Sequence, residues 1–218
     1  MLRIALLLSL SLAFLIWGAL MPQPRPTPSG PNPSPNTPQY TSDGSLVFPT
    51  NYREWVYLSS GVDMNYNPAF QKMDHSMFDN VFVNPEAYKS FLQTGTWPDK
   101  TMLVLEVRMA ADHASINKAG HFQTGDVMGL EIHVKDESRF SPGKWAFFGF
   151  ADDKPATAFA KDMPCYSCHE QHGAVDTTFT QFYPTLIEIA KKKGTLSAAY
   201  MKEEAAGGKG QDAGSKKP

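Results

Sequence analysis

The two cysteines of the chain, Cys165 and Cys168, are separated by two residues, and His169 follows directly. This C-x-x-C-H spacing is the attachment signature of c-type haem. Two thiols three residues apart on a helical turn can reach the two vinyl groups of one porphyrin, and the adjacent imidazole can ligate the iron. The motif therefore predicts one haem c, attached through both cysteines, with His169 as its axial ligand.

Other uses of a cysteine pair compete with haem attachment. A structural zinc site needs about four nitrogen or sulfur ligands, whereas the chain has no second cysteine pair. His172 could add a ligand, but a three-residue offset within one helix is cramped. A thioredoxin-type disulfide would place the motif at the start of a helix in a βαβ unit, and a coincidental pair is the third alternative. Haem is favoured because an export-type leader would send the chain to the compartment where haem c is attached.

The second axial position of the iron decides between ligand binding and electron transfer, because electron-transfer cytochromes fill both positions, often with His and Met. The other methionines and histidines are expected in a polar loop (Met64, Met73, Met77), in strand cores (Met102, Met109, Met128) or at the surface (His75, His113, His121, His133). We therefore expect a vacant or water-filled distal side and a five-coordinate iron.

Hydrophobic patterning predicts the elements that must position the haem. Alternating or apolar runs indicate strands at residues 54–58, 78–83, 101–109, 126–135 and 145–150, and helices are expected at 85–94, 154–161, 165–173 and 176–193. Asn84 and Pro85 resemble a helix cap and first turn, and Gly95 a stop. Successive strands favour an antiparallel sheet. The expected fold class is α+β, a mostly antiparallel sheet with flanking helices and the haem on a C-terminal helical segment.

Aromatic residues before and after the cysteine motif are expected to form the haem pocket: Phe147, Phe148, Phe150, Phe179, Phe182 and Tyr183.

The two ends of the chain differ from its middle. Residues 1–20 have a basic start and a 17-residue uncharged run, which predicts a signal peptide or an N-terminal anchor. Residues 21–39 are rich in proline and are expected to form an extended linker. Residues 40–190 are expected to form the haem domain, and residues 191–218 a basic, Gly/Lys-rich disordered tail. The predicted location is the periplasm or the outer face of the cytoplasmic membrane, with membrane contact only through an uncleaved leader.

Charge is distributed unevenly along the chain. The whole carries −2, but the first 39 residues hold two basic and no acidic residues, and the chain from Lys191 holds seven lysines against three acids. The part between them therefore carries −8. Such an acidic body argues against nucleic acid as a partner and could dock a basic redox partner, such as a small cytochrome.

Several segments together resemble the cytochrome P-460 family over residues 46–186. The matching segments are Asn51-Tyr52-Arg53-Glu54-Trp55, Val81-Phe82-Val83-Asn84-Pro85 with Tyr88 and Thr94-Gly95, Thr101 to Val107, Gly125-Asp126 with Gly129-Leu130-Glu131, Trp145-Ala146-Phe147, the C-x-x-C-H motif, and Phe179 to Leu186. The resemblance implies a mostly antiparallel β-structure with flanking helices, a homodimer, and one c-type haem with a histidine ligand. No catalytic role is carried onto Arg53, Glu54 or Trp55.

One position departs from the hydroxylamine-oxidising members of this family. In those members a lysine tied to the porphyrin rim precedes the glutamate of the central strand, and here Leu105 stands in that place before Glu106. An alkyl side chain cannot form that bond. The lysine-lacking relatives, the cytochrome c′-beta proteins, are similar to gas-binding cytochromes with a five-coordinate haem in an apolar distal pocket. Leu105, Leu103 and Phe147 are the candidate residues for that pocket.

Three functions follow from these observations. The first is an exported mono-haem cytochrome that binds NO or related small nitrogen oxides. The second is a haem enzyme that oxidises hydroxylamine and passes electrons to a small cytochrome. The third is a six-coordinate electron-transfer cytochrome with Met or His as the sixth ligand.

Overall fold

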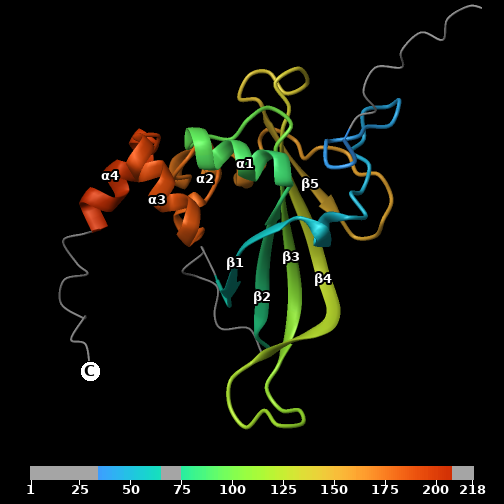
Figure 1. Ribbon diagram of the computed structural model, residues 1–218. Helices are drawn as coiled ribbons and strands as arrows, with labels where there is room; N and C mark the ends of the chain where they lie inside the picture. Colours follow the sequence, from blue (N-terminus) through green and yellow to red (C-terminus); the bar gives the residue numbers. More distant parts are fainter. Residues whose placement is uncertain (1–33, 65–74, 208–218) are drawn as a thin grey trace, which may run out of the picture. The chain divides into compact units, whose positions relative to one another are not determined.

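The computed structural model describes residues 34–64 and 75–207, all within a compact unit that spans Pro33–Pro218. Their five strands form one antiparallel sheet in which each strand pairs with its neighbours in sequence (Figure 1). The strands are β1 (Val56–Val62), β2 (Met77–Val83), β3 (Met102–Ala111), β4 (Phe122–Lys135) and β5 (Trp145–Phe150). The helices are α1 (Pro85–Thr94), α2 (Pro164–His172), α3 (Pro184–Lys193) and α4 (Ala198–Gly207), with 3-10 turns at Tyr52–Glu54 and Thr180–Phe182. The predicted α+β class is confirmed.

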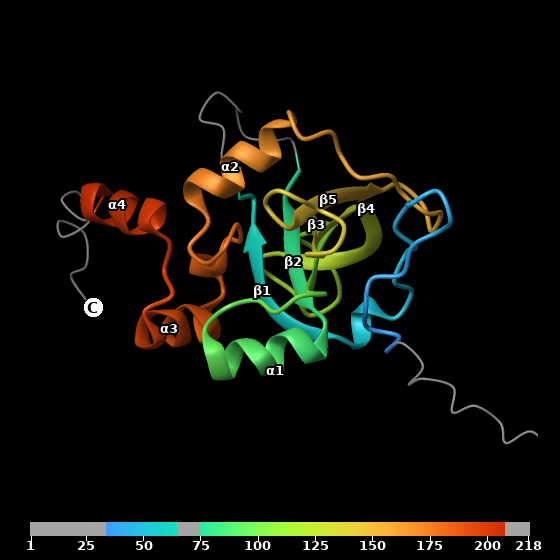
Figure 2. The same cartoon turned by 90° about the horizontal axis from the view of Figure 1, so that it is seen from above.

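Side chains alternate along the strands, so the two faces of the sheet pack against different parts of the chain. On one face Met102, Val104 and Ile132 pack with residues of the N-terminal segment in an apolar core. On the other face Val83 and Leu103 pack against helices α1 and α3. In Figure 2 the N-terminal segment, in blue, lies on one side of the sheet and helices α2, α3 and α4 lie on the other. The second face is the one that carries the candidate site.

Helix α1 has the predicted bounds, but Asn84 does not cap it as expected. Pro85 occupies its first turn, and Gly95 ends it with a positive φ of 76° and an N–H bonded to the carbonyl of Phe91. The Asn84 side chain instead accepts a hydrogen bond from the Met102 N–H at 2.8 Å and donates to the Lys100 carbonyl. Asn84 thereby ties the start of α1 to the start of β3.

Two of the predicted helices differ from the structure. Residues 154–161 form no helix, because Ala156 and Ala158 make β-bridges to Leu46 and Phe148 and hold this segment extended. The helix predicted for 176–193 begins only at Pro184, whose fixed φ suits a first helical turn. The residues before it form turns and the short 3-10 helix.

Ordered structure extends beyond residues 40–190 at both ends. Helix α4 lies within the segment predicted to be disordered, and its Ala-rich sequence favours a helix more than the surrounding Gly and Lys content suggests. Asn36, expected in the linker, accepts a hydrogen bond from the Trp55 indole at 3.0 Å. The predicted leader, most of the linker and residues 208–218 lie outside the described residues. Within residues 34–64 and 75–207, no helix combines the length and apolar character that crossing a bilayer requires.

Candidate functional site

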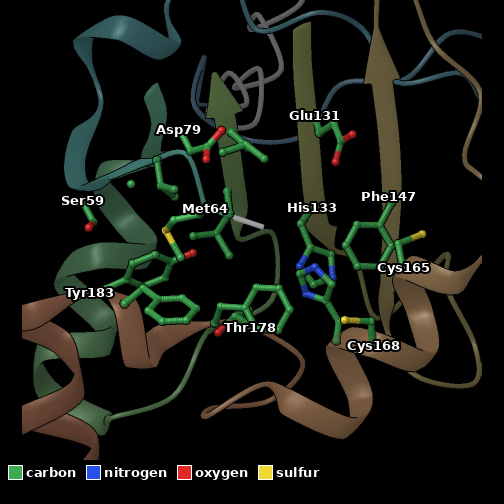
Figure 3. Close-up of a pocket in the computed structure, with 17 residues that line it drawn as sticks. Ser59, Met64, Asp79, Glu131, His133, Phe147, Cys165, Cys168, Thr178 and Tyr183 are labelled. Atoms are coloured by element: carbon green, nitrogen blue, oxygen red, sulfur yellow. The ribbon is translucent and has the colours of Figure 1, made fainter. Parts of the chain in front are cut away.

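A cavity of about 280 Å³ opens between the second face of the sheet and helix α2 (Figure 3). It is lined by all six residues that the sequence assigned to haem attachment or to the distal pocket: Cys165, Cys168, His169, Leu103, Leu105 and Phe147. These residues come from two strands and a helix that lie far apart in the sequence. The pairing register of the strands therefore decides which side chains meet in this cavity.

Two cross-strand rows of the sheet form the floor of this cavity. In the first, Val81 pairs with Leu105, which pairs with Glu131. In the next, Leu103 pairs with His133, which pairs with Phe147. Because side chains alternate in strands, these residues of equal parity all face α2. The register therefore fixes Leu105 in the cavity wall.

His169 is held in an orientation suited to ligating iron. Its Nδ1 lies 2.7 Å from the Thr177 carbonyl oxygen, so with Nδ1 protonated the ring donates there and Nε2 keeps its lone pair. The ring stacks on Phe179 at a centroid distance of 4.1 Å. Burial lowers the pKa of His169 and favours the neutral imidazole. A Cβ at Gly173 would lie 2.6 Å from the His169 carbonyl oxygen, so glycine lets the chain turn back and present Thr177.

The two thiols accompany this imidazole along helix α2. Cys165 and Cys168 are free, partly buried and one helical turn apart, and both line the cavity. Burial raises the pKa of each thiol, so both are neutral at ordinary pH. Two thiols and a histidine with a free Nε2 on one wall of a largely apolar cavity form a donor set that fits a c-type haem.

The alternative zinc ligand set is not assembled. His172 is half exposed, and its Nδ1 lies 3.0 Å from a carboxylate oxygen of Glu203 on α4. Among the residues that the structure describes, no group of three or more His, Cys, Asp or Glu side chains is placed to hold a metal ion. The motif begins a helix, as a thioredoxin-type disulfide would, but it follows an antiparallel sheet and not a βαβ unit.

His133 is buried, so the prediction that it lies at the surface was wrong. It is 7% exposed and stacks on Phe147 at a centroid distance of 3.9 Å. Its ring also lies 4.9 Å from that of His169. Burial lowers the pKa of His133 well below its usual value, so it stays neutral. Side chains alternate along β4, so His133 and Glu131, two residues apart, face the same side of the sheet. This alternation is the sequence signal that could have placed His133 in the cavity wall.

Two carboxylates in the cavity wall were missed by the sequence reasoning. Burial, with the nearby charges of Asp63 and Glu131, raises the pKa of Asp79 to about 6. Desolvation at the cavity also raises the pKa of Glu131, although the residue as a whole is exposed. Figure 3 shows both at the end of the cavity away from Thr178 and Tyr183. The cavity as a whole is therefore not purely apolar.

The aromatic residues divide between the two faces of the sheet. Phe147, Phe179, Phe182 and Tyr183 line the cavity as predicted. Phe148 and Phe150 do not, because they belong to the core on the opposite face. Phe147 lies edge-on to His169 at a centroid distance of 4.6 Å, so these two rings share one part of the cavity wall.

The segment that includes Arg53 contacts Glu106, on the face of the sheet opposite the cavity. The carboxylate of Glu106, 2% exposed, accepts hydrogen bonds from the Tyr52 hydroxyl and from the guanidinium groups of Arg53 and Arg108. These bonds outweigh desolvation and lower the pKa of Glu106 to about 2. Tyr52 and Arg53 thus take part in an ion-pair network that does not include the cavity-lining carboxylates.

An antiparallel sheet and helix α2 bring a histidine and two thiols into one largely apolar cavity, a set of donors that fits a haem. The family model described as cytochrome P460 matches residues 49–180, more than half of the chain, and the chain belongs to the cytochrome P460 family. A comparison with curated proteins gave no match. The matched region ends within the 3-10 turn after α2, so α3 and α4 lie beyond it.

Proposed function

We propose that this protein is an exported mono-haem c-type cytochrome that binds NO or related small nitrogen oxides. Cys165 and Cys168 would hold the porphyrin through thioether bonds, and His169 would ligate the iron. The observation that carries the proposal is that Cys165, Cys168 and His169 line the same cavity, while the contact of His169 Nδ1 with the Thr177 carbonyl leaves Nε2 as the nitrogen with a lone pair. When bound, haem supplies an iron centre that takes up diatomic ligands.

The wall of the cavity supports ligand binding over oxidation. Val81, Leu103 and Leu105 present alkyl groups, which suit uncharged diatomic molecules. Of the lysines in residues 34–64 and 75–207, none lines the cavity. Lys100 instead pairs with Asp136, and Lys89 belongs to α1. A lysine tether to the porphyrin rim therefore has no candidate among these residues.

The proposal is tested on protein produced in a host competent for cytochrome c maturation. The wild type is expected to gain the mass of one haem, to give a pyridine haemochrome, and to change its ferrous absorption spectrum with NO and with CO. The variant His169→Ala should lose the spectrum of a histidine-ligated haem. His172→Ala is the matched control, because His172 lies on the same helix but pairs with Glu203 at the surface.

Two results would contradict the proposal. If the wild-type protein were colourless, haem attachment would be refuted. Gas binding, hydroxylamine oxidation and electron transfer would be refuted with it. If the protein were coloured but neither gas changed its spectrum, the proposed ligand binding would be refuted. Electron transfer would then remain as the candidate function.

One observation favours hydroxylamine oxidation as a second candidate function. Oxidation of hydroxylamine releases protons, and the carboxylates of Asp79 and Glu131 line the cavity where they could accept them. Turnover with an artificial electron acceptor that falls at least about 10²-fold in both Asp79→Asn and Glu131→Gln would support this function. No turnover by the wild type would remove it.

Location and partners complete the proposal. We infer export to the periplasm or to the outer face of the cytoplasmic membrane from residues 1–20. The family resemblance supports a homodimer. The charge of −8 between the N-terminal 39 residues and Lys191 supports docking of a small basic redox cytochrome.

A further inference from the structure

Met64 lies in the loop after β1, as the sequence predicts, and it also lines the cavity. Among the methionines of residues 34–64 and 75–207, it is the only one that lines this cavity. Figure 3 shows its sulfur projecting into the cavity from the side away from Cys165 and Cys168. A soft thioether thus faces the space that the iron ligand His169 also faces.

The backbone beside Met64 is held by hydrogen bonds to the start of β2. The Asp63 N–H donates to the Met77 carbonyl at 3.0 Å, and an Asp63 carboxylate oxygen accepts from the Met77 N–H at 2.9 Å. The other carboxylate oxygen accepts from the Ser76 hydroxyl at 2.8 Å. Asp63 itself has a positive φ of 53°, which turns the chain at the end of β1. These contacts fix where the Met64 side chain starts.

Gly61 leaves the space that the Met64 sulfur occupies. A Cβ at position 61 would lie 2.2 Å from the Met64 Sδ and 2.7 Å from its Cγ. Any side chain at 61 would therefore displace the thioether. The sequence at the end of β1 combines a glycine, a turn and a methionine whose sulfur is directed into the cavity.

We propose that the Met64 sulfur binds the haem iron from the side opposite His169 in the resting protein and gives way to small ligands. This inference rests on the proposed haem site and adds a regulation to it. The thioether donates a lone pair to the iron, and no proton or electron is transferred. When a diatomic ligand takes the position, the sulfur–iron bond breaks and the neutral side chain returns to the cavity wall.

Thioether ligation suits this cavity better than ligation by the carboxylates. A neutral thioether brings no charge into a wall built largely of alkyl and aromatic groups. Asp79 and Glu131 would each have to ionise in a setting that raises their pKa values. Methionine–histidine ligation also raises the reduction potential of haem iron. An internal ligand that holds about nine tenths of the molecules would weaken apparent binding of an external ligand about tenfold.

The test compares haem-loaded wild type with Met64→Leu, which keeps the bulk and removes the sulfur. We expect a low-spin ferric signal and a far-red sulfur-to-iron absorption band in the wild type. Met64→Leu should become high-spin, show a lower reduction potential, and bind NO about tenfold more tightly. Gly61→Ala should behave like Met64→Leu, because its Cβ displaces the sulfur without removing it.

Met128→Leu is the matched control, because Met128 is 52% exposed on β4 and does not line this cavity. It should keep the wild-type spectrum. A wild-type protein that is high-spin, or that is unchanged by Met64→Leu, would overturn the role of Met64 and leave the proposed haem function standing. Wild-type protein without haem would instead overturn the proposed function.

Discussion

The pKa values of two carboxylates on neighbouring strands, Glu106 and Asp79, are shifted in opposite directions because their partners differ. Glu106 is buried against two guanidinium groups and a tyrosine hydroxyl, which lower its pKa to about 2. Burial, together with the nearby charges of Asp63 and Glu131, raises the pKa of Asp79 to about 6. Burial alone would raise both. The cationic partners therefore mark Glu106 as structural, whereas the raised pKa of Asp79 suits it to exchanging protons in the cavity.

We predict that Glu106→Gln destabilises the haem-loaded protein by about 3–5 kcal/mol above pH 4.5, because two guanidinium groups lose their shared anion. Urea unfolding measures the difference. Since the folded pKa of Glu106 is lowered from 4.5 to about 2, its contribution is present above 4.5 and is lost as pH falls towards 2. The gap between wild type and variant should shrink over that range.

The control for this prediction is Glu54→Gln, an exposed carboxylate in the adjacent 3-10 turn. It should change the free energy of unfolding by less than about 0.5 kcal/mol. Equal effects of the two substitutions would show that the ion-pair network adds no stability of its own.

Asp79→Asn should have the opposite dependence on pH. The folded pKa of Asp79 is raised from 3.8 to about 6, so the wild type loses stability as pH rises through that range. Asparagine cannot ionise, so the variant should gain on the wild type between those values. Unfolding free energies of both proteins across the range provide the measurement, with exposed Asp126→Asn as the control. A difference that did not vary with pH would contradict a raised pKa at Asp79.

At the scale of elements, periodicity predicted most of what positions the site. The sequence located β2, α1, β3, β5 and α2 closely, because each has a clear apolar repeat or a proline start and glycine stop. It missed His133, Asp79 and Glu131, since their places depend on which face of each strand meets α2, and that is set by pairing across the whole sheet. Met64 was missed for a related reason, because the turn at Asp63 directs it back over Gly61.

Helix α4 lies outside the family match yet contacts the helix that carries the haem motif. Ser197, just before α4, donates from its hydroxyl to the Gly173 carbonyl at 2.7 Å and from its N–H to the Ala174 carbonyl at 2.8 Å. Tyr200 is 9% exposed and packs in a cluster with Ala174 and Ile187. Since Gly173 follows α2 directly, α4 braces the end of that helix.

We therefore predict that Tyr200→Ala lowers the free energy of unfolding by about 3 kcal/mol and speeds hydrogen exchange of the α2 amides. Unfolding measurements give the change in stability. Hydrogen exchange on the haem-loaded protein gives the separate effect on the α2 amides. Met201→Ala, at a residue 51% exposed on the same helix, should alter neither. Unchanged exchange in α2 with Tyr200→Ala would show that α4 stabilises only itself.

At the scale of the whole molecule, the site needs distant parts of the chain, and the proposed haem attachment would also need export. The cavity is lined by residues from Ser59 on β1 to Tyr183 before α3, so the sheet and the helices must dock before it exists. The thiols that would hold the haem are neutral and only partly buried. Folding alone therefore prepares the site, and the predicted leader in residues 1–20 would bring it to the place of haem attachment.

We predict that a chain beginning at Met21 folds but gains no haem in a host that matures c-type cytochromes outside the cytoplasm, whereas the full chain gains the mass of one. Circular dichroism checks folding, and intact mass checks attachment. An unrelated export leader fused before Met21 should restore the haem, because a leader acts as an address. Cys168→Ser in the full chain should lose one of the two thioether bonds. If the chain beginning at Met21 still carried covalent haem, the part played by residues 1–20 would be refuted while the assignment of Cys165 and Cys168 stood.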